Sequence, residues 1–271
     1  MWYKVKRIMV WDKQVRPPVI PQYLCFTANT AGSTIQLTQT WTPTAVTLET
    51  STDWSTWTTY TIWDTITLSN IWDKVFWRNT STTDTWFSTW SSNYYKFVMT
   101  GSIAWSWDIN YLLNKMSTNT VSDWCYNALF YGCTSLTTSP KLPATTLAMA
   151  CYRQMFRSCT GLTTPPELPA TTLADSCYIN MFTNCTNLTT IPKLPVITLP
   201  DWCYREMFTY CSKIKLSSPQ TWEYQTAYRI PVTWTGTAGT NSLYNMFQYT
   251  GWTFKSTPLI NTTYYTSNEV V

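Results

Sequence analysis

Cysteine recurs in this chain at a fixed interval, and this repeat constrains the fold more than any other feature. Two sets of four cysteines each advance by 26 residues: Cys125, Cys151, Cys177 and Cys203, and then Cys133, Cys159, Cys185 and Cys211. Between the paired cysteines the chain reads C-Y-x-x-M-F-x-x-C, with Leu129 in place of Met in the first unit. A fixed period of this length indicates a repeat architecture in which each unit buries its apolar face against the next.

The cysteine-flanked half of each unit predicts a short amphipathic helix. On a helical wheel of about 100° per residue, the five fixed positions of the motif fall within one apolar arc. The variable positions fall outside that arc, and in the second and fourth units they include Arg153, Arg157 and Arg205. We therefore expect a buried face of constant residues and an outer face that is free to vary.

The other half of each unit predicts an extended segment. Leu136, Leu162, Leu188 and Ile214 share one position of the repeat, and prolines follow in the first three units. Proline lacks an N–H, so a strand of two or three residues followed by an extended run is expected. Lys141, Glu167 and Lys193 share another position, so stacking of the units would place their charges in one row.

Together the two halves predict a right-handed solenoid of leucine-rich-repeat type, with a short helix and a short strand in each repeat. The complete fold prediction is a multidomain, mainly β chain with α/β repeats, in which an antiparallel β-sandwich precedes the solenoid. Alternating segments such as "STIQLTQT" and "TITL" indicate the sandwich. The predicted parts are a lead segment (1–21), the β-sandwich (22–104), a connector with a short helix (105–120), a four-unit solenoid (121–217) and a C-terminal cap (218–271).

The segment "CYINMFTNCTNLTTIPKLP", preceded by "LPATTLADS", resembles the BspA-like leucine-rich repeats of bacterial surface proteins. The resemblance covers residues 121–217, and the segment before it resembles the β-domain that often precedes such repeats. It implies a surface-exposed or extracellular protein without enzymatic activity that mediates adhesion by binding protein or glycan ligands. No recognisable signal peptide is found, because no apolar stretch follows the basic residues near the N-terminus.

The eight repeat cysteines allow three interpretations. Zinc binding is disfavoured because C-x7-C is not a usual ligand spacing. Disulfides are disfavoured because residues eight apart on a helix lie about 12 Å apart along its axis, and equivalent residues on neighbouring helices also lie too far apart. The favoured interpretation is two ladders of small buried apolar side chains. Cys25, the ninth cysteine, has no evident partner.

Tryptophan stands at several positions where turn chemistry and the resembling family favour glycine. The chain contains 17 Trp and only 7 Gly. The affected positions are Trp54, Trp63, Trp72, Trp105, Trp107 and Trp252. Since some bacterial lineages read UGA as glycine and others as tryptophan, an alternative genetic code would explain the pattern. The competing interpretation is that all 17 are genuine and form carbohydrate-stacking aromatics. Trp57, Trp77, Trp124 and Trp202 are interpreted as true tryptophans.

The composition argues against enzymatic activity. The chain has no histidine, which removes Ser-His-Asp, Cys-His and His-metal arrangements. Its charged residues amount to 12%, and no acidic pair suggests glycosidase geometry. We expect no catalytic residues, no cofactor and no metal. The net charge of +4 is too scattered to predict nucleic-acid binding, and no segment is long enough to insert into a membrane.

The remaining functional classes are binding and structure. The first hypothesis is the surface adhesion protein that the resemblance implies, and the alternative is a phage virion or tail-associated component for receptor binding or structure. A third is a purely structural spacer. The expected ligand-binding positions are the outer ones: Lys141, Arg153, Arg157, Glu167, Lys193 and Arg205. Each of them is also compatible with an ordinary solvated polar face.

Overall fold

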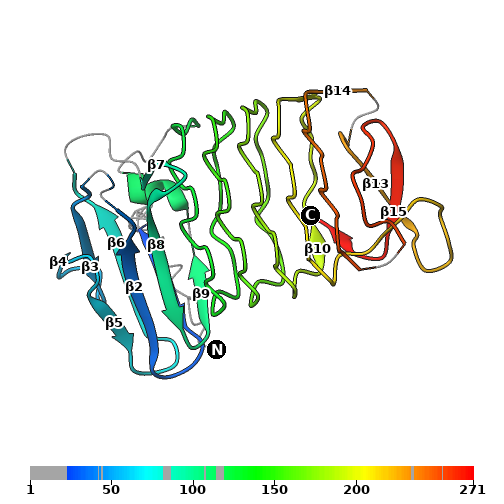
Figure 1. Ribbon diagram of the computed structural model, residues 1–271. Helices are drawn as coiled ribbons and strands as arrows, with labels where there is room; N and C mark the ends of the chain where they lie inside the picture. Colours follow the sequence, from blue (N-terminus) through cyan, green and yellow to red (C-terminus); the bar gives the residue numbers. More distant parts are fainter. Residues whose placement is uncertain are drawn as a thin grey trace, which may run out of the picture.

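The computed structural model describes residues 23–41, 43, 45–81, 87–106, 108–113, 119–232, 235–251 and 253–271. The predicted lead segment (1–21) lies outside these residues. Two parts follow each other along the chain: a β-domain (residues 23–106) and a stack of coils (residues 119–217), with a C-terminal unit at the far end of the stack (Figure 1). The chain is mainly β in character.

The β-domain consists of two antiparallel sheets, which is consistent with the predicted β-sandwich. Five strands form one sheet in the order β4-β3-β6-β1-β9, and four form the other in the order β5-β2-β8-β7. The strands are β1 (Leu24–Ala28), β2 (Ser33–Gln39), β3 (Leu48–Ser51), β4 (Thr58–Tyr60), β5 (Thr65–Leu68), β6 (Lys74–Asn79), β7 (Ser88–Trp90), β8 (Asn93–Thr100) and β9 (Ile103–Ser106).

Alternating side chains fix which face of each sheet is buried. In β2, Ser33, Ile35 and Leu37 are buried while the residues between them are partly exposed. A shift of register by one residue would turn these apolar side chains outward, so the pattern specifies the pairing. The sandwich core contains Phe26, Trp77 and Phe97, whose rings meet at steep angles of 67–90°.

The predicted helix in each repeat is wrong. Within residues 119–217 the chain forms consecutive turns, and the only helix in the described part of the chain is the 3₁₀ helix η1 (Ile109–Leu113), which lies in the predicted connector. In the second unit Ala150, Gln154 and Ser158 have φ of 52–61°. A left-handed residue every four positions interrupts any α-helix, so no helix-and-strand solenoid of leucine-rich-repeat type is formed.

Hydrogen bonds between the units replace those of the expected helix. The N–H of Tyr152 donates to the Cys177 carbonyl of the next unit at 3.0 Å, whereas the following N–H, of Arg153, donates back to Ala150 at 3.2 Å. This alternation runs from Ala150 to Cys159 and recurs in the other units. Half of the donors therefore close local turns and half join one coil to the next, which satisfies the backbone without a helix.

The failure of the helix prediction has a simple geometric cause. The motif places its first Cys, Met and second Cys four residues apart, a strict period of four. An α-helix drifts by only about 40° for every four residues, so a nine-residue motif fits both a helix and a chain of four-residue turns. A helical wheel alone therefore cannot distinguish an α-helix from a run of four-residue turns. Asparagine, which tolerates positive φ, occupies such positions at Asn180 and Asn184.

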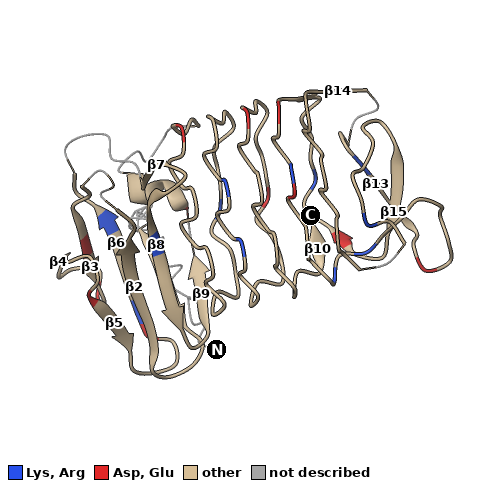
Figure 2. Cartoon of the chain, viewed as in Figure 1, with Lys and Arg blue, Asp and Glu red and all other residues tan. Residues whose placement is uncertain are grey.

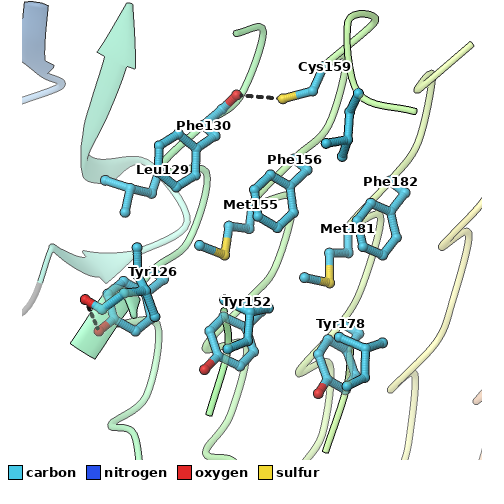
Figure 3. Packing of buried hydrophobic residues seen from close by; sticks show 14 of the residues in the cluster. Tyr126, Leu129, Phe130, Tyr152, Met155, Phe156, Cys159, Tyr178, Met181 and Phe182 are labelled. Carbon is cyan, nitrogen blue, oxygen red and sulfur yellow. Dashed lines mark hydrogen bonds between the residues drawn. The ribbon is translucent and has the colours of Figure 1, made fainter. Parts of the chain in front are cut away.

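Equivalent side chains stack directly on one another along the coils. The rings of Phe130, Phe156, Phe182 and Phe208 are parallel within 2–7°, with centroids 5.5–5.7 Å apart. A second column begins with Tyr126, Tyr152 and Tyr178, and Figure 3 shows both columns with the methionines between them. The Phe column continues into the β-domain at Phe97 and into the C-terminal unit at Phe247.

The extended half of each coil carries the predicted leucine and proline positions. The four leucine-position residues are completely buried: Leu136, Leu162, Leu188 and Ile214. Isolated parallel bridges join Thr120 to Thr146 and Thr146 to Thr172, and Ile103 of β9 is bridged to Leu136. The last strand of the β-domain thus occupies the place of a preceding coil, so the stack grows directly from the sandwich.

The C-terminal unit closes the stack. Its strands β13, β14, β15 and β16 pair with each other or with the short strands β10, β11 and β12 of the last coils, in the pairs β10-β16 and β11-β14 and the sheet β12-β15-β13. They are β10 (Thr190–Ile191), β11 (Thr198–Leu199), β12 (Leu216–Ser217), β13 (Thr226–Arg229), β14 (Thr237–Ala238), β15 (Thr263–Thr266) and β16 (Glu269–Val270). Residues 256 and 257 accept hydrogen bonds from Phe247 and Asn245, so outward donors of the final coil are satisfied.

Candidate ligand-binding surfaces

The outer positions of the turn runs form one surface, which we call the turn face. It comprises the exposed and half-buried non-motif positions of residues 123–133, 149–159, 175–185 and 201–211. Because adjacent coils are in register, equivalent outer residues lie in rows, for example Arg153, Ile179 and Arg205. The interior residues of the coils hardly vary, whereas these rows do.

Two of the predicted binding residues meet on this face. Arg157 lies over the ring of Tyr131 from the preceding coil, at 5.7 Å, and Lys96 of β8 lies over the same ring at 5.2 Å. Arg153 lies close enough to Arg157 for their charges to interact. We call Lys96, Arg153, Arg157 and Tyr131 the basic cluster. It forms where the β-domain meets the first two coils.

The electrostatics of the cluster reflect its like charges. Burial lowers the pKa of the Arg153 guanidinium, and the positive charge of Arg157 lowers it further. Burial raises the pKa of the neighbouring Tyr94 hydroxyl. No ion pair to a carboxylate is found for Lys96, Arg153 or Arg157 within the described residues. Within the described residues, the positive charge of the cluster is therefore not balanced by a carboxylate.

Arg205, the third predicted arginine, has a different environment. Its Nε donates to Glu206 Oε1 at 3.1 Å, and its guanidinium lies 5.2 Å from the ring centre of Tyr244. Glu206 also accepts a hydrogen bond from Asn180 Nδ2 at 2.9 Å. The charge of Arg205 is thus compensated within its own coil, and the structure does not bring it into the basic cluster.

The predicted charge row lies among the prolines of the extended halves of the coils, and Figure 2 shows how sparse charged residues are along the coils. Lys141 and Glu167 both line a shallow groove of about 530 Å³ whose walls are largely proline. Asp108 is bridged to Lys141 and extends the row, so its charges alternate in sign along the stack. Among the residues that the structure describes, no ion pair joins Lys141, Glu167 or Lys193.

Lys193 lines a separate groove of about 610 Å³ with residues of the C-terminal unit, including Tyr228, Arg229 and Tyr265. The six predicted residues are therefore distributed over four settings: the basic cluster, the Arg205–Glu206 pair, the proline groove and this C-terminal groove. Among the described residues, no ion pair or cation–π contact joins one setting to another.

All eight repeat cysteines are buried and none forms a disulfide. The second cysteine of each later unit donates its S–H to the Phe carbonyl of the preceding unit, and Cys133 donates to Phe97 of β8. The bond from Cys159 Sγ to Phe130 O, drawn in Figure 3, is 3.0 Å long. Burial raises the pKa of Cys177 and of Cys185 to about 12. These thiols are therefore protonated at neutral pH and poor nucleophiles.

The tryptophans at predicted turn positions divide into two groups. Trp54, Trp63 and Trp72 have φ of 72–82°, the left-handed region that favours glycine. Trp105 instead lies in β9, paired with Phe26 and nearly buried, so the turn argument does not apply to it. Trp107 and Trp252 lie outside the described residues. Trp124 and Trp202, which we interpreted as genuine, also have positive φ because their row adopts it in every coil.

The described residues contain no group of three or more Cys, Asp and Glu side chains arranged to hold a metal ion. No helix in the described part of the chain has the length and apolar character required to cross a membrane. Comparison of the chain with protein-family models, with curated proteins and with solved structures gives no match. The resemblance to BspA-like repeats therefore stays a prediction.

Sequence reasoning missed Lys96 and Tyr131. The alternation of β8 places Tyr94, Lys96 and Val98 on its outer face, and this much is readable from the sequence. Nothing in the sequence indicates that β8 adjoins the first coil, a contact in which the Phe97 N–H donates to the Leu129 carbonyl at 2.8 Å. The cluster depends on that tertiary contact.

Proposed function

We propose that this chain is a non-enzymatic, surface-exposed binding protein that mediates attachment to protein or glycan ligands through the outer rows of its coils. The observation that supports this function is the contrast between interior and exterior. Each coil repeats the same Cys, Tyr, Met or Leu, and Phe side chains inside, while the row at position 154 reads Gln154, Asn180 and Glu206 on the outside of the last three coils. A fixed frame with variable outer residues suits recognition of a ligand along an extended surface.

The continuity of the structure also supports a binding role. The aromatic column joins the β-domain to the coils through the Phe97–Phe130 contact, with ring centroids 5.4 Å apart. A ligand on the turn face would therefore meet side chains whose positions are fixed by one core. Preorganisation of this kind reduces the entropic cost of binding.

Protease shaving of the native source, either cells or particles, tests the proposed location. Release of peptides from residues 141–220 without lysis would support a surface role, provided that peptides of an internal marker protein are not released. Failure to release them from intact cells or particles would contradict it. Recovery of the chain in purified virions would instead favour the phage component.

A further inference from the structure

The basic cluster carries three cations that no carboxylate in the described residues neutralises. The acid nearest to it along the first coil, Asp123, accepts a hydrogen bond from the backbone N–H of Met149 at 2.9 Å. The absence of an internal counter-ion distinguishes this cluster from Arg205, which has the same chemistry but is paired with Glu206. An external anion is the partner that the cluster lacks.

Aromatic rings hold the cations in place without cancelling their charge. Tyr131 lies within 5.2 Å of Lys96 Nζ and 5.7 Å of the Arg157 guanidinium carbon. Such contacts restrict long, flexible side chains before a ligand arrives, and they leave the N–H donors free for hydrogen bonds. A guanidinium presents these donors as a planar fork that matches a carboxylate or a sulfate.

The surroundings of the cluster favour a saccharide over a peptide. The neighbouring outer residues Gln154, Ser158 and Asn184 are amides and hydroxyls, and Asn184 Nδ2 donates to Ser158 Oγ at 3.3 Å. Such groups pair well with sugar hydroxyls. Protein interfaces, in contrast, are usually anchored by large apolar side chains in pockets, and these three residues offer none.

We infer that the basic cluster of Lys96, Arg153 and Arg157 binds the carboxylate or sulfate group of an acidic oligosaccharide. This inference rests on the proposed binding function and specifies the ligand class and the site. Among the three cations only Arg153 contacts a tryptophan of the described residues, the ring of Trp124 at 5.6 Å, whereas Lys96 and Arg157 contact Tyr131.

Isothermal titration of the full chain with three hexasaccharides tests the inference. The probes are a heparin-derived hexasaccharide with sulfates and carboxylates, a hyaluronan hexasaccharide with carboxylates only, and neutral cellohexaose. We expect at least one acidic probe to bind, cellohexaose not to bind, and binding to weaken from 50 to 300 mM NaCl. Comparison of the two acidic probes shows which anion is recognised. A hexaglutamate peptide that binds as tightly as the better sugar would overturn the assignment to a glycan.

Matched variants locate the site. Arg153→Gln and Arg157→Gln should each weaken binding about tenfold, and Lys replacements should retain part of the affinity because the charge remains. Arg205→Gln removes the same charge from the same row two coils away and should change the affinity less than twofold. Equal losses in all three Gln variants would assign binding to overall charge and overturn the site.

Arginine modification provides a measurement that needs no variant. The bound acidic hexasaccharide should protect Arg153 and Arg157, but not Arg205, from phenylglyoxal in the unmodified protein.

If a protein or neutral glycan binds and its affinity is unchanged in Arg153→Gln and Arg157→Gln, the proposed function holds and this inference fails. If no protein or glycan of either kind binds the chain at all, both fail.

Discussion

The β-domain and the coil stack bury aromatic rings in opposite ways. In the sandwich, Phe26, Trp77 and Trp105 meet edge to face, each in a different environment. In the coils, each ring faces its own counterpart from the neighbouring unit at nearly zero angle. Antiparallel pairing brings different residues together, whereas parallel stacking at a fixed period brings identical ones together.

The difference affects how each region responds to perturbation. A change at one sandwich position alters a single set of contacts. A perturbation that acts on every coil, such as titration of a repeated group, changes the free energy of unfolding by the sum of its effects on all units. The coils should therefore be more sensitive than the sandwich to conditions that act on cysteine.

The largest expected effect is alkaline unfolding of the coils. An unfolded thiol titrates near 9, whereas burial raises the pKa of Cys133, Cys177 and Cys185 to about 12. Both states are protonated below pH 9, so stability is intact there. Above pH 9 only the unfolded state loses protons, which lowers the free energy of unfolding by about 1.4 kcal/mol per thiol for each pH unit.

Summed over eight such thiols, this loss of stability within one or two pH units is comparable to the roughly 5–15 kcal/mol stability of a typical domain. Urea denaturation at pH 7, 9 and 10.5 measures how the free energy of unfolding falls with pH, and hydrogen exchange shows which region loses stability. We expect the coils to lose protection before the β-domain, which has only Cys25. Cys177→Ala should reduce the pH dependence of the free energy of unfolding by the contribution of one thiol. Coils that keep their full stability at pH 10.5 would contradict the burial of these thiols.

The next effect concerns the stacked column. Phe156→Ala removes a ring that stacks on Phe130 and Phe182, and it should cost about 3–5 kcal/mol in the free energy of unfolding. Phe247→Ala, at the end of the column, loses one stacked contact and one edge contact with Tyr228, so it should cost less. Thermal and urea denaturation of both variants measure the difference, and equal costs would argue against stacking as its source.

The two cysteine positions should differ in their response to serine. Cys177→Ser buries a hydroxyl among apolar side chains and should cost about 1–3 kcal/mol. Cys185→Ser should cost less, because the new hydroxyl can donate to the Phe156 carbonyl, which the thiol now reaches at 3.0 Å. Denaturation curves of both variants test this order. A larger cost for Cys185→Ser would contradict it.

The smallest expected effect has the opposite sign. Trp72 is 72% exposed with φ of 72°, so Trp72→Gly should stabilise the protein by about 1 kcal/mol through relief of left-handed strain. Trp57→Gly is the control and should destabilise, because Trp57 contacts Tyr23 and Arg78. Mass spectrometry of the native protein tests the recoding hypothesis directly: glycine at 54, 63 and 72 would support it, and tryptophan would contradict it.

The sequence alone predicted the repeat, its period and several strands of the β-domain, because alternation and periodicity are local signals. The residues of β2 and β5 match segments that the alternation singled out. The conformation within each repeat was not predictable, because nine residues cannot distinguish a period of 3.6 from one of four. The sequence named Arg153 and Arg157 as candidate binding positions but did not predict the basic cluster. Lys96 joins it through a contact between β8 and the first coil.

The phenylalanine column has a consequence for how such a chain changes over generations. Phe97 and Phe247 contact the coils through the same stacking that joins one coil to the next, at 5.4 and 5.5 Å. Gene duplication or deletion of one 26-residue unit would therefore preserve both end contacts. Each added unit would lengthen the molecule by about one strand spacing, ~4.8 Å. The length of the molecule can thus evolve in discrete steps while the contacts at its two ends stay unchanged.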